Sequence, residues 1–216
     1  AVSGAVARKG AERLADYNNA ATLAKLAAAA ADGSLGGAQS AATLASVTKE
    51  EAERQGLAPS HAAVKGAVLA RIALVDDGTH PFGCAAGALR RRYEQFHAES
   101  ELIIPQFSAA LGMMSPHLDA LSTLADQSQA LTVSHLQNTL DETEWLPEAA
   151  RRLGAHAASA FGAGFGGSVW ALVDAKEALA FSATWQAEYA QAYPGRQPHA
   201  RFFTMERPPS GASSVL

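Results

Sequence analysis

Glycine is concentrated in one short segment in the last third of the chain. Residues 161–168 read Phe-Gly-Ala-Gly-Phe-Gly-Gly-Ser. Glycine permits positive φ angles and lets another molecule or another part of the chain approach the backbone closely. Successive backbone N–H groups in such a turn can form a concave site that favours an anion. The segment is therefore the first candidate for a functional site.

The same segment satisfies the Gly-x-Gly-x-x-Gly pattern of dinucleotide-binding proteins through Gly162, Gly164 and Gly167. In those proteins the pattern opens a helix. Here residues 168–173 predict a strand, and residues 157–161 predict another strand before the glycines. The context therefore argues against a dinucleotide site. A wide glycine hairpin that binds nothing stays open as the structural alternative.

The remaining reactive residues form no recognisable metal-binding pattern. The seven histidines lack His-x-x-x-His spacing, and Cys84 is the single cysteine, so the sequence offers no paired zinc ligands. No Gly-x-Ser-x-Gly segment marks a hydrolase nucleophile, although one sequence leaves open a Ser/His/Asp triad assembled by the fold. We therefore expect no metal site in this chain.

The elements around the glycine segment are predicted as helices in the middle of the chain and strands towards its ends. Helical composition or apolar stripes with helical spacing predict helices over residues 11–31, 64–75, 89–103 with a break at Pro105, 118–135, a stretch ending at Leu153, and 175–193. The start before Leu153 is ambiguous, because the capping-box spacing of Asp141 and Glu144 would leave Pro147 inside the helix.

Strands are predicted for the opening residues 1–6, for the two segments that flank the glycines, and for residues 200–204. This order favours an α+β fold in which helices cover a small, mainly antiparallel sheet. At 216 residues and 48% hydrophobic content, the chain is long enough to bury a substantial core.

Composition also excludes several classes of partner. A net charge of −4 with 18% charged residues provides no basic face for nucleic acid. The longest apolar stretch, Leu23 to Ala31, is too short to span a membrane. A lone cysteine and the lack of a secretory signal favour a cytoplasmic protein.

From Gly154 to Val173 the chain reads GAHAASAFGAGFGGSVWALV, which resembles the third conserved motif of the GHMP kinases in its galactokinase form. The resemblance extends to residues 92–99, to residues 126–138 and to Tyr17-Asn18, and it is weakest between residues 33 and 82. It implies that residues 1–216 form a GHMP kinase C-terminal domain, truncated at its N-terminal side. Such a domain has a ferredoxin-like sheet with extra helices, and residues 205–216 would form a flexible tail.

In that family the intact enzyme transfers the γ-phosphate of ATP to the anomeric hydroxyl of galactose or a close sugar. The resemblance implies that ATP and Mg²⁺ are bound mainly by an N-terminal domain, which also carries the catalytic aspartate. It thus implies no catalytic residue in this chain, and the isolated chain is expected to be inactive. Its partners would be the sugar, ATP and that N-terminal domain. The residues implied to line the site are Gly162, Ala163, Gly164, Phe165, Gly166, Gly167 and Ser168, with Tyr17 as a substrate-binding residue.

Some residues depart from the family pattern. Asn19 and Ala20 stand where many relatives have arginines, and Asp141 replaces a usual proline. The sugar therefore stays open, and Tyr17 can equally be a tyrosine packed on its helix. The alternatives are another GHMP small-molecule kinase, a non-catalytic sugar sensor on the same fold, or a simple α+β interaction module. A half-enzyme should also expose apolar surface beside the glycine segment and the strand that begins at Ala1.

Overall fold

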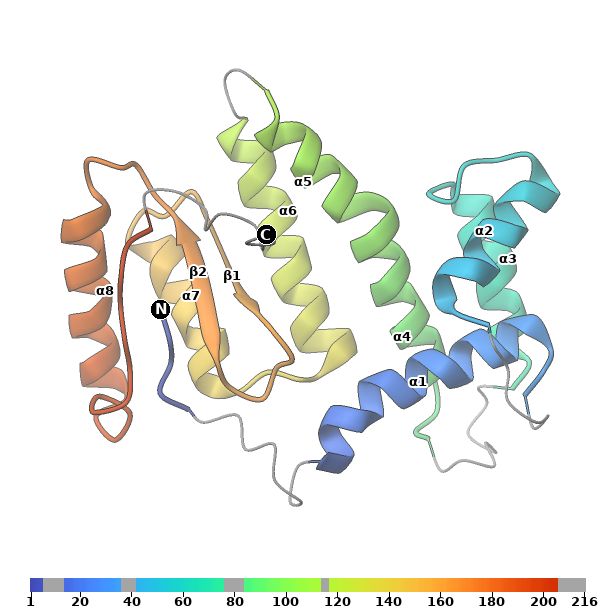
Figure 1. The fold of residues 1–216 in the computed structure, drawn as a ribbon, viewed down its shortest axis with the longest axis horizontal. Coiled ribbons are helices and arrows are strands. Elements are labelled where there is room, and N and C mark those ends of the chain that lie inside the picture. Colours follow the sequence, from blue (N-terminus) through green and yellow to red (C-terminus); the bar gives the residue numbers. More distant parts are fainter. Residues whose placement is uncertain (6–13, 36–41, 76–83, 114–116, 206–216) are drawn as a thin grey trace, which may run out of the picture.

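The computed structural model describes residues 1–5, 14–35, 42–75, 84–113 and 117–205, and for residues 14–17 it describes the backbone alone. The predicted α+β class is confirmed, because helices dominate and a small antiparallel sheet lies among them (Figure 1). In these ranges no helix is both long and apolar enough to cross a lipid bilayer. The predicted tail at residues 205–216 falls almost wholly outside the described residues.

Four helices form a unit that we call the helical lobe. They are α1 (Leu14–Asp32), α2 (Leu44–Gln55), α3 (Ala62–Ala73) and α4 (Ala88–His97), and they pack around one core cluster. The stripe predicted from Val64 onwards is confirmed, since Val64, Val68 and Ile72 of α3 are fully buried. Thr43 and Ser46 cap the start of α2 with reciprocal hydrogen bonds, and Gly56 ends it in the left-handed conformation.

Two long helical rods connect the lobe to the sheet. The first runs from α4 through the π-helix η1 (Ala98–Ile103) into α5 (Ile104–Leu111). The second runs from α6 (Leu118–Leu131) into the π-helix η2 (Thr132–Leu136), and the two rods lie side by side (Figure 1). The predicted break at Pro105 is wrong. Pro105 lies in the first turn of α5, where a missing N–H is tolerated, and helical turns continue across it.

The second core cluster lies between α7 (Asp141–Arg152), β1 (Ala157–Phe161), β2 (Ser168–Leu172) and α8 (Ala178–Ala192). β1 and β2 are antiparallel, with Ala157 opposite Leu172 and Phe161 opposite Ser168. Ala158 and Val169 point into this cluster together with Trp185 and Tyr189 of α8. Both predicted strands beside the glycines are therefore confirmed.

The two ends of the described chain extend this sheet through isolated antiparallel bridges. Val2 pairs with Ser168 on one side and with Arg201 on the other. The Tyr189 hydroxyl donates to the carbonyl of Ser3 at 2.6 Å and fixes the opening segment against α8. If residues 1–5 and 200–202 are counted as strands, the spatial order is fourth, first, third, second, as in a ferredoxin-like sheet.

The ambiguous helix start is settled at Asp141, which does not serve as the cap. Leu140 occupies the N-cap position, and its N–H donates to the Thr143 hydroxyl at 2.9 Å. Pro147 does lie inside α7 and cannot donate to the Thr143 carbonyl. The side chain of Gln129, on α6, donates to that carbonyl instead, at 3.4 Å.

Candidate functional site

The turn between β1 and β2, residues 162–167, is called the glycine loop below. Gly162, Gly164, Gly166 and Gly167 all have positive φ, between 84° and 118°. Phe165 also has a positive φ, 53°, although it is not a glycine. Since residues other than glycine rarely adopt positive φ angles, the backbone conformation of the loop explains why it is rich in glycine.

One side of the glycine loop packs against Asn138, the second residue after η2. The Phe165 N–H donates to the Asn138 carbonyl at 2.5 Å, and the Asn138 side-chain amide donates to the Ala163 carbonyl at 3.3 Å. A Cβ at Gly164 would lie 2.6 Å from Cγ of Asn138, far closer than real contacts allow. Glycine at 164 is therefore required by packing as well as by φ.

The start of the glycine loop is exposed. In the part of the chain that the structure describes, a Cβ built on Gly162 or Gly167 would meet nothing within 4 Å, and the Gly162–Ala163 segment is exposed. The end of the loop is tied to the opening segment, because the Ser3 N–H donates to the Gly167 carbonyl at 2.9 Å. The loop is thus fixed at Asn138 and at its Gly167 end, while Gly162 and Ala163 are accessible to another molecule or chain.

Two further residues implied by the resemblance, Ser168 and Tyr17, belong to other elements of the fold. Ser168 begins β2 and is half-buried where that strand meets Val2. Tyr17 belongs to the first turn of α1, and its side chain lies outside the described part of the structure. The start of α1 and the glycine loop both lie towards the lower side of Figure 1. Asn18 and Asn19, next to Tyr17, are exposed.

Gln129 is a structural residue of the site that the sequence did not reveal. Its Oε1 accepts from the Ala160 N–H at 2.9 Å and from the Ser159 hydroxyl at 3.1 Å. Its amide nitrogen donates to Thr143, as described above. Gln129 thereby joins α6 to β1 and to α7, and it supports the strand that leads into the glycine loop. The one signal in the sequence was Pro147, which leaves a helical carbonyl in need of another donor.

One large apolar side chain is exposed directly before the glycine loop. Phe161 is 57% exposed. Phe203, which is 58% exposed, lies beyond the Arg201 bridge and so past the Ala1 end of the opening segment. Phe107 of α5 contacts Trp170 of β2 edge to face, with ring centroids 6.0 Å apart. An apolar surface beside the loop and the opening segment stays a prediction, to which the exposed ring of Phe161 conforms.

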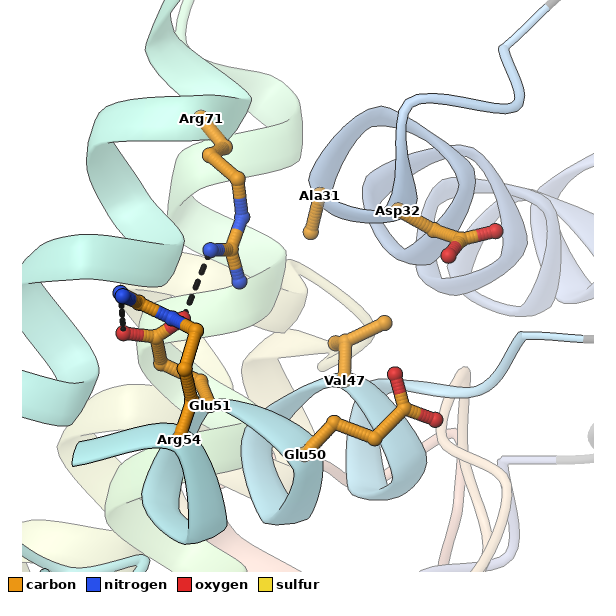
Figure 2. Close-up of a pocket in the computed structure, with 7 residues that line it drawn as sticks. All are labelled: Ala31, Asp32, Val47, Glu50, Glu51, Arg54 and Arg71. Atoms are coloured by element: carbon orange, nitrogen blue, oxygen red, sulfur yellow. Dashed lines mark hydrogen bonds and ion pairs between the residues drawn. The ribbon is translucent and has the colours of Figure 1, made fainter. Parts of the chain in front are cut away.

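Two cavities lie elsewhere, and no residue of the glycine loop lines either of them. One, of about 380 Å³, lies between α6 and α7 beside Gln129. The other, of about 290 Å³, lies in the helical lobe around Glu51, Arg54 and Arg71 (Figure 2). Within the described ranges, no three or more His, Cys, Asp or Glu side chains are grouped to hold a metal ion.

The charged cavity in the helical lobe is organised by Glu51, whose side chain is 1% exposed. Arg54 donates to it at 2.5 and 3.1 Å, Arg71 donates at 2.7 Å, and Gln55 also donates to it. The hydrogen bonds from Arg54, then those from Arg71 and Gln55, lower the pKa of Glu51 to about 2 although burial opposes this. Glu51 is therefore ionised at neutral pH and joins α2 to α3.

Residues 108–191 match the family described as GHMP kinases C terminal. The matched segment runs from within α5 to near the end of α8, so it contains Gln129, Asn138 and the whole glycine loop. This match supports a place for the chain in the GHMP kinase superfamily. No curated protein matches the chain.

Proposed function

We propose that this chain contributes the substrate side of the active site in an ATP-dependent sugar kinase of the GHMP superfamily. The observation that carries the proposal is the glycine loop, which lies inside the matched segment, is fixed at Asn138 and is exposed at Gly162 and Ala163. A rigid, accessible backbone turn is suited to pack beside bound substrate or beside a phosphate-binding loop.

In the proposed reaction of the intact enzyme, the anomeric hydroxyl oxygen of galactose, or of a close sugar, attacks the γ-phosphorus of ATP. The bond to the β-phosphate oxygen breaks, ADP leaves, and the hydroxyl gives up its proton. Catalysis of such transfers depends chiefly on positioning and charge stabilisation. In this proposal Mg²⁺-ATP and the proton acceptor belong to an N-terminal domain. Residues 162–168 shape the site, and Tyr17 contacts the sugar.

Cytoplasmic location forms part of the same proposal, because a single cysteine and an ATP-dependent reaction suit a reducing, ATP-rich compartment. One feature of α1 leaves the identity of the sugar open. Asn19 and Ala20 replace arginines that many galactokinase relatives carry, which favours testing arabinose, uronic acids and non-sugar alcohols alongside galactose.

The experiment measures ADP release by the intact parent protein with ATP, Mg²⁺ and each candidate substrate. We expect release that depends on one sugar, with galactose or a close sugar preferred, and no turnover above background from the 216-residue chain alone. Binding of sugar without ADP release would favour a sugar sensor. Sugar-dependent ADP release from the isolated chain would contradict the proposed division of the active site.

A further inference from the structure

We propose that Asn138 is a positioning residue, which holds the glycine loop in the conformation that the transfer reaction uses. This inference rests on the function proposed above. Asn138 would not touch the reacting atoms. Its effect would pass through Ala163, Gly164 and Phe165, the consecutive loop residues that it contacts.

The first observation is backbone strain on both sides of the contact. Gln137 has a φ of 54° and Phe165 a φ of 53°, and in the described chain these are the two residues other than glycine with positive φ. They flank the hydrogen bond from the Phe165 N–H to the Asn138 carbonyl. A disfavoured conformation persists where surrounding contacts fix it, and such sites cluster at functional positions.

The second observation is that the Asn138 side chain reduces the stability of the fold. It is 9% exposed, and its Oδ1 is buried without a hydrogen-bond partner in the described chain. The Ala163 carbonyl can only accept, so the amide nitrogen must face it and the oxygen must face away. An orphaned buried acceptor reduces stability. A residue that costs stability while donating to the loop is better explained by loop geometry than by folding.

The third observation is the shape of the contact. Asn138 lies so close to Gly164 that a methyl group there would overlap it, whereas among the described residues no atom lies within 4 Å of a Cβ built on Gly162 or Gly167. η2 brings Asn138 to this place, and its π-helical turns end at Gln137. Such wide turns are frequent where a helix must aim residues at a functional site. The rod of α6 and η2 therefore supports the loop at Asn138 and leaves Gly162 and Ala163 accessible to a ligand.

The first test measures amide hydrogen exchange in the 216-residue chain. We expect Asn138→Ala to raise the exchange rate of amides in residues 162–167 roughly tenfold, since a hydrogen bond and a close contact are lost. Asn138→Asp should act in the same direction, because a carboxylate cannot donate to Ala163. Amides of α2 should not change, and Gln186→Ala, at an exposed amide on α8, should leave the loop as in the wild type. Unchanged loop exchange in Asn138→Ala would overturn the inference.

The second test compares kcat of the intact parent with and without Asn138→Ala, per folded molecule. A loosened loop should lower kcat several-fold, while a purely structural role would lower the melting temperature and leave kcat of the folded enzyme unchanged. If the wild type is active and the variant has the same kcat, the role of Asn138 is overturned and the proposed function is not. A wild type without sugar-kinase activity would overturn the proposed function, and with it the reaction that Asn138 serves.

Discussion

Glu51 shows how one buried charge can hold two helices together. Its partners on α2 and α3 offset the cost of removing the carboxylate from water, and the two arginines keep part of their own side chains exposed. The arrangement explains the charged cavity in the helical lobe by packing, without a ligand. A salt bridge between exposed side chains, such as Lys49 with Glu53 in the same helix, contributes much less.

Glu51→Gln should lower the unfolding free energy by about 1 to 3 kcal/mol at pH 7, because hydrogen bonds to a charged group are lost. The folded pKa, about 2, lies below the usual value of 4.5, so the stabilisation is present above pH 4.5 and is lost as pH falls towards 2. Urea unfolding at several pH values should therefore show the difference from the wild type shrinking below pH 4.5. Glu50→Gln, at the exposed neighbouring position, serves as the control and should change stability little. A difference that stayed constant down to pH 2 would contradict this assignment.

At the scale of elements, the sequence predicted helices and strands well where one face is buried. The stripe of α3 follows directly from the spacing of its apolar residues, and the strands β1 and β2 from the runs that flank the glycines. The π-helices η1 and η2 could not be predicted, because the apolar spacing that identifies a helix does not distinguish a few π-helical turns within it. In the structure the Ser128 hydroxyl donates to Glu99 of η1 at 2.9 Å. Pro105 by itself predicts a break, but a proline in the first turn of a helix is tolerated, and helical turns continue across it.

A substitution at Gln129 tests how α6 is joined to β1 and α7. Gln129→Leu should destabilise the chain on the order of 2 to 4 kcal/mol, since it leaves the Ala160 N–H and the Thr143 carbonyl without this partner. Thermal or urea unfolding would measure the change. Gln127→Leu, two residues earlier on an exposed face of α6, is the matched control. Equal effects of the two substitutions would show that the Gln129 bridge contributes nothing.

At the scale of the whole molecule, the chain combines the helical lobe with a layer of helices on a small sheet (Figure 1). The class of fold could be predicted from the order of helices and strands. The position of the terminal segments could not, because Val2 meets Ser168 and Arg201 through single bridges that leave no periodic pattern. Their placement depends on long-range contacts such as that between Tyr189 and Ser3.

The residues of the candidate site likewise fall into those that the sequence could identify and those that it could not. Its glycines could be identified from composition alone, since their density has few explanations other than an exposed, positive-φ turn. Asn138 could not be identified, because an asparagine between a helix and a loop carries no distinctive signal. Its role depends on a contact across 25 positions of the chain. That contact also makes Gly164 unsuitable for testing the function of the loop. Any side chain at Gly164 would disturb the packing against Asn138, whatever it did to activity.

The most direct test of the central claim is kcat/KM of the intact parent with Gly162→Val, measured together with its melting temperature. Within the described ranges no atom lies within 4 Å of a Cβ built on Gly162, so valine should cost mainly backbone strain, roughly 1 to 3 kcal/mol, while filling the exposed start of the loop. Gly66→Ala, on an exposed turn of α3 without positive φ, is the control and should slightly raise stability. If the glycine loop lines the active site, kcat/KM per folded molecule should fall at least about tenfold, or about 1.4 kcal/mol, for Gly162→Val and stay unchanged for Gly66→Ala. Full activity per folded Gly162→Val molecule would contradict a place for the loop in the active site.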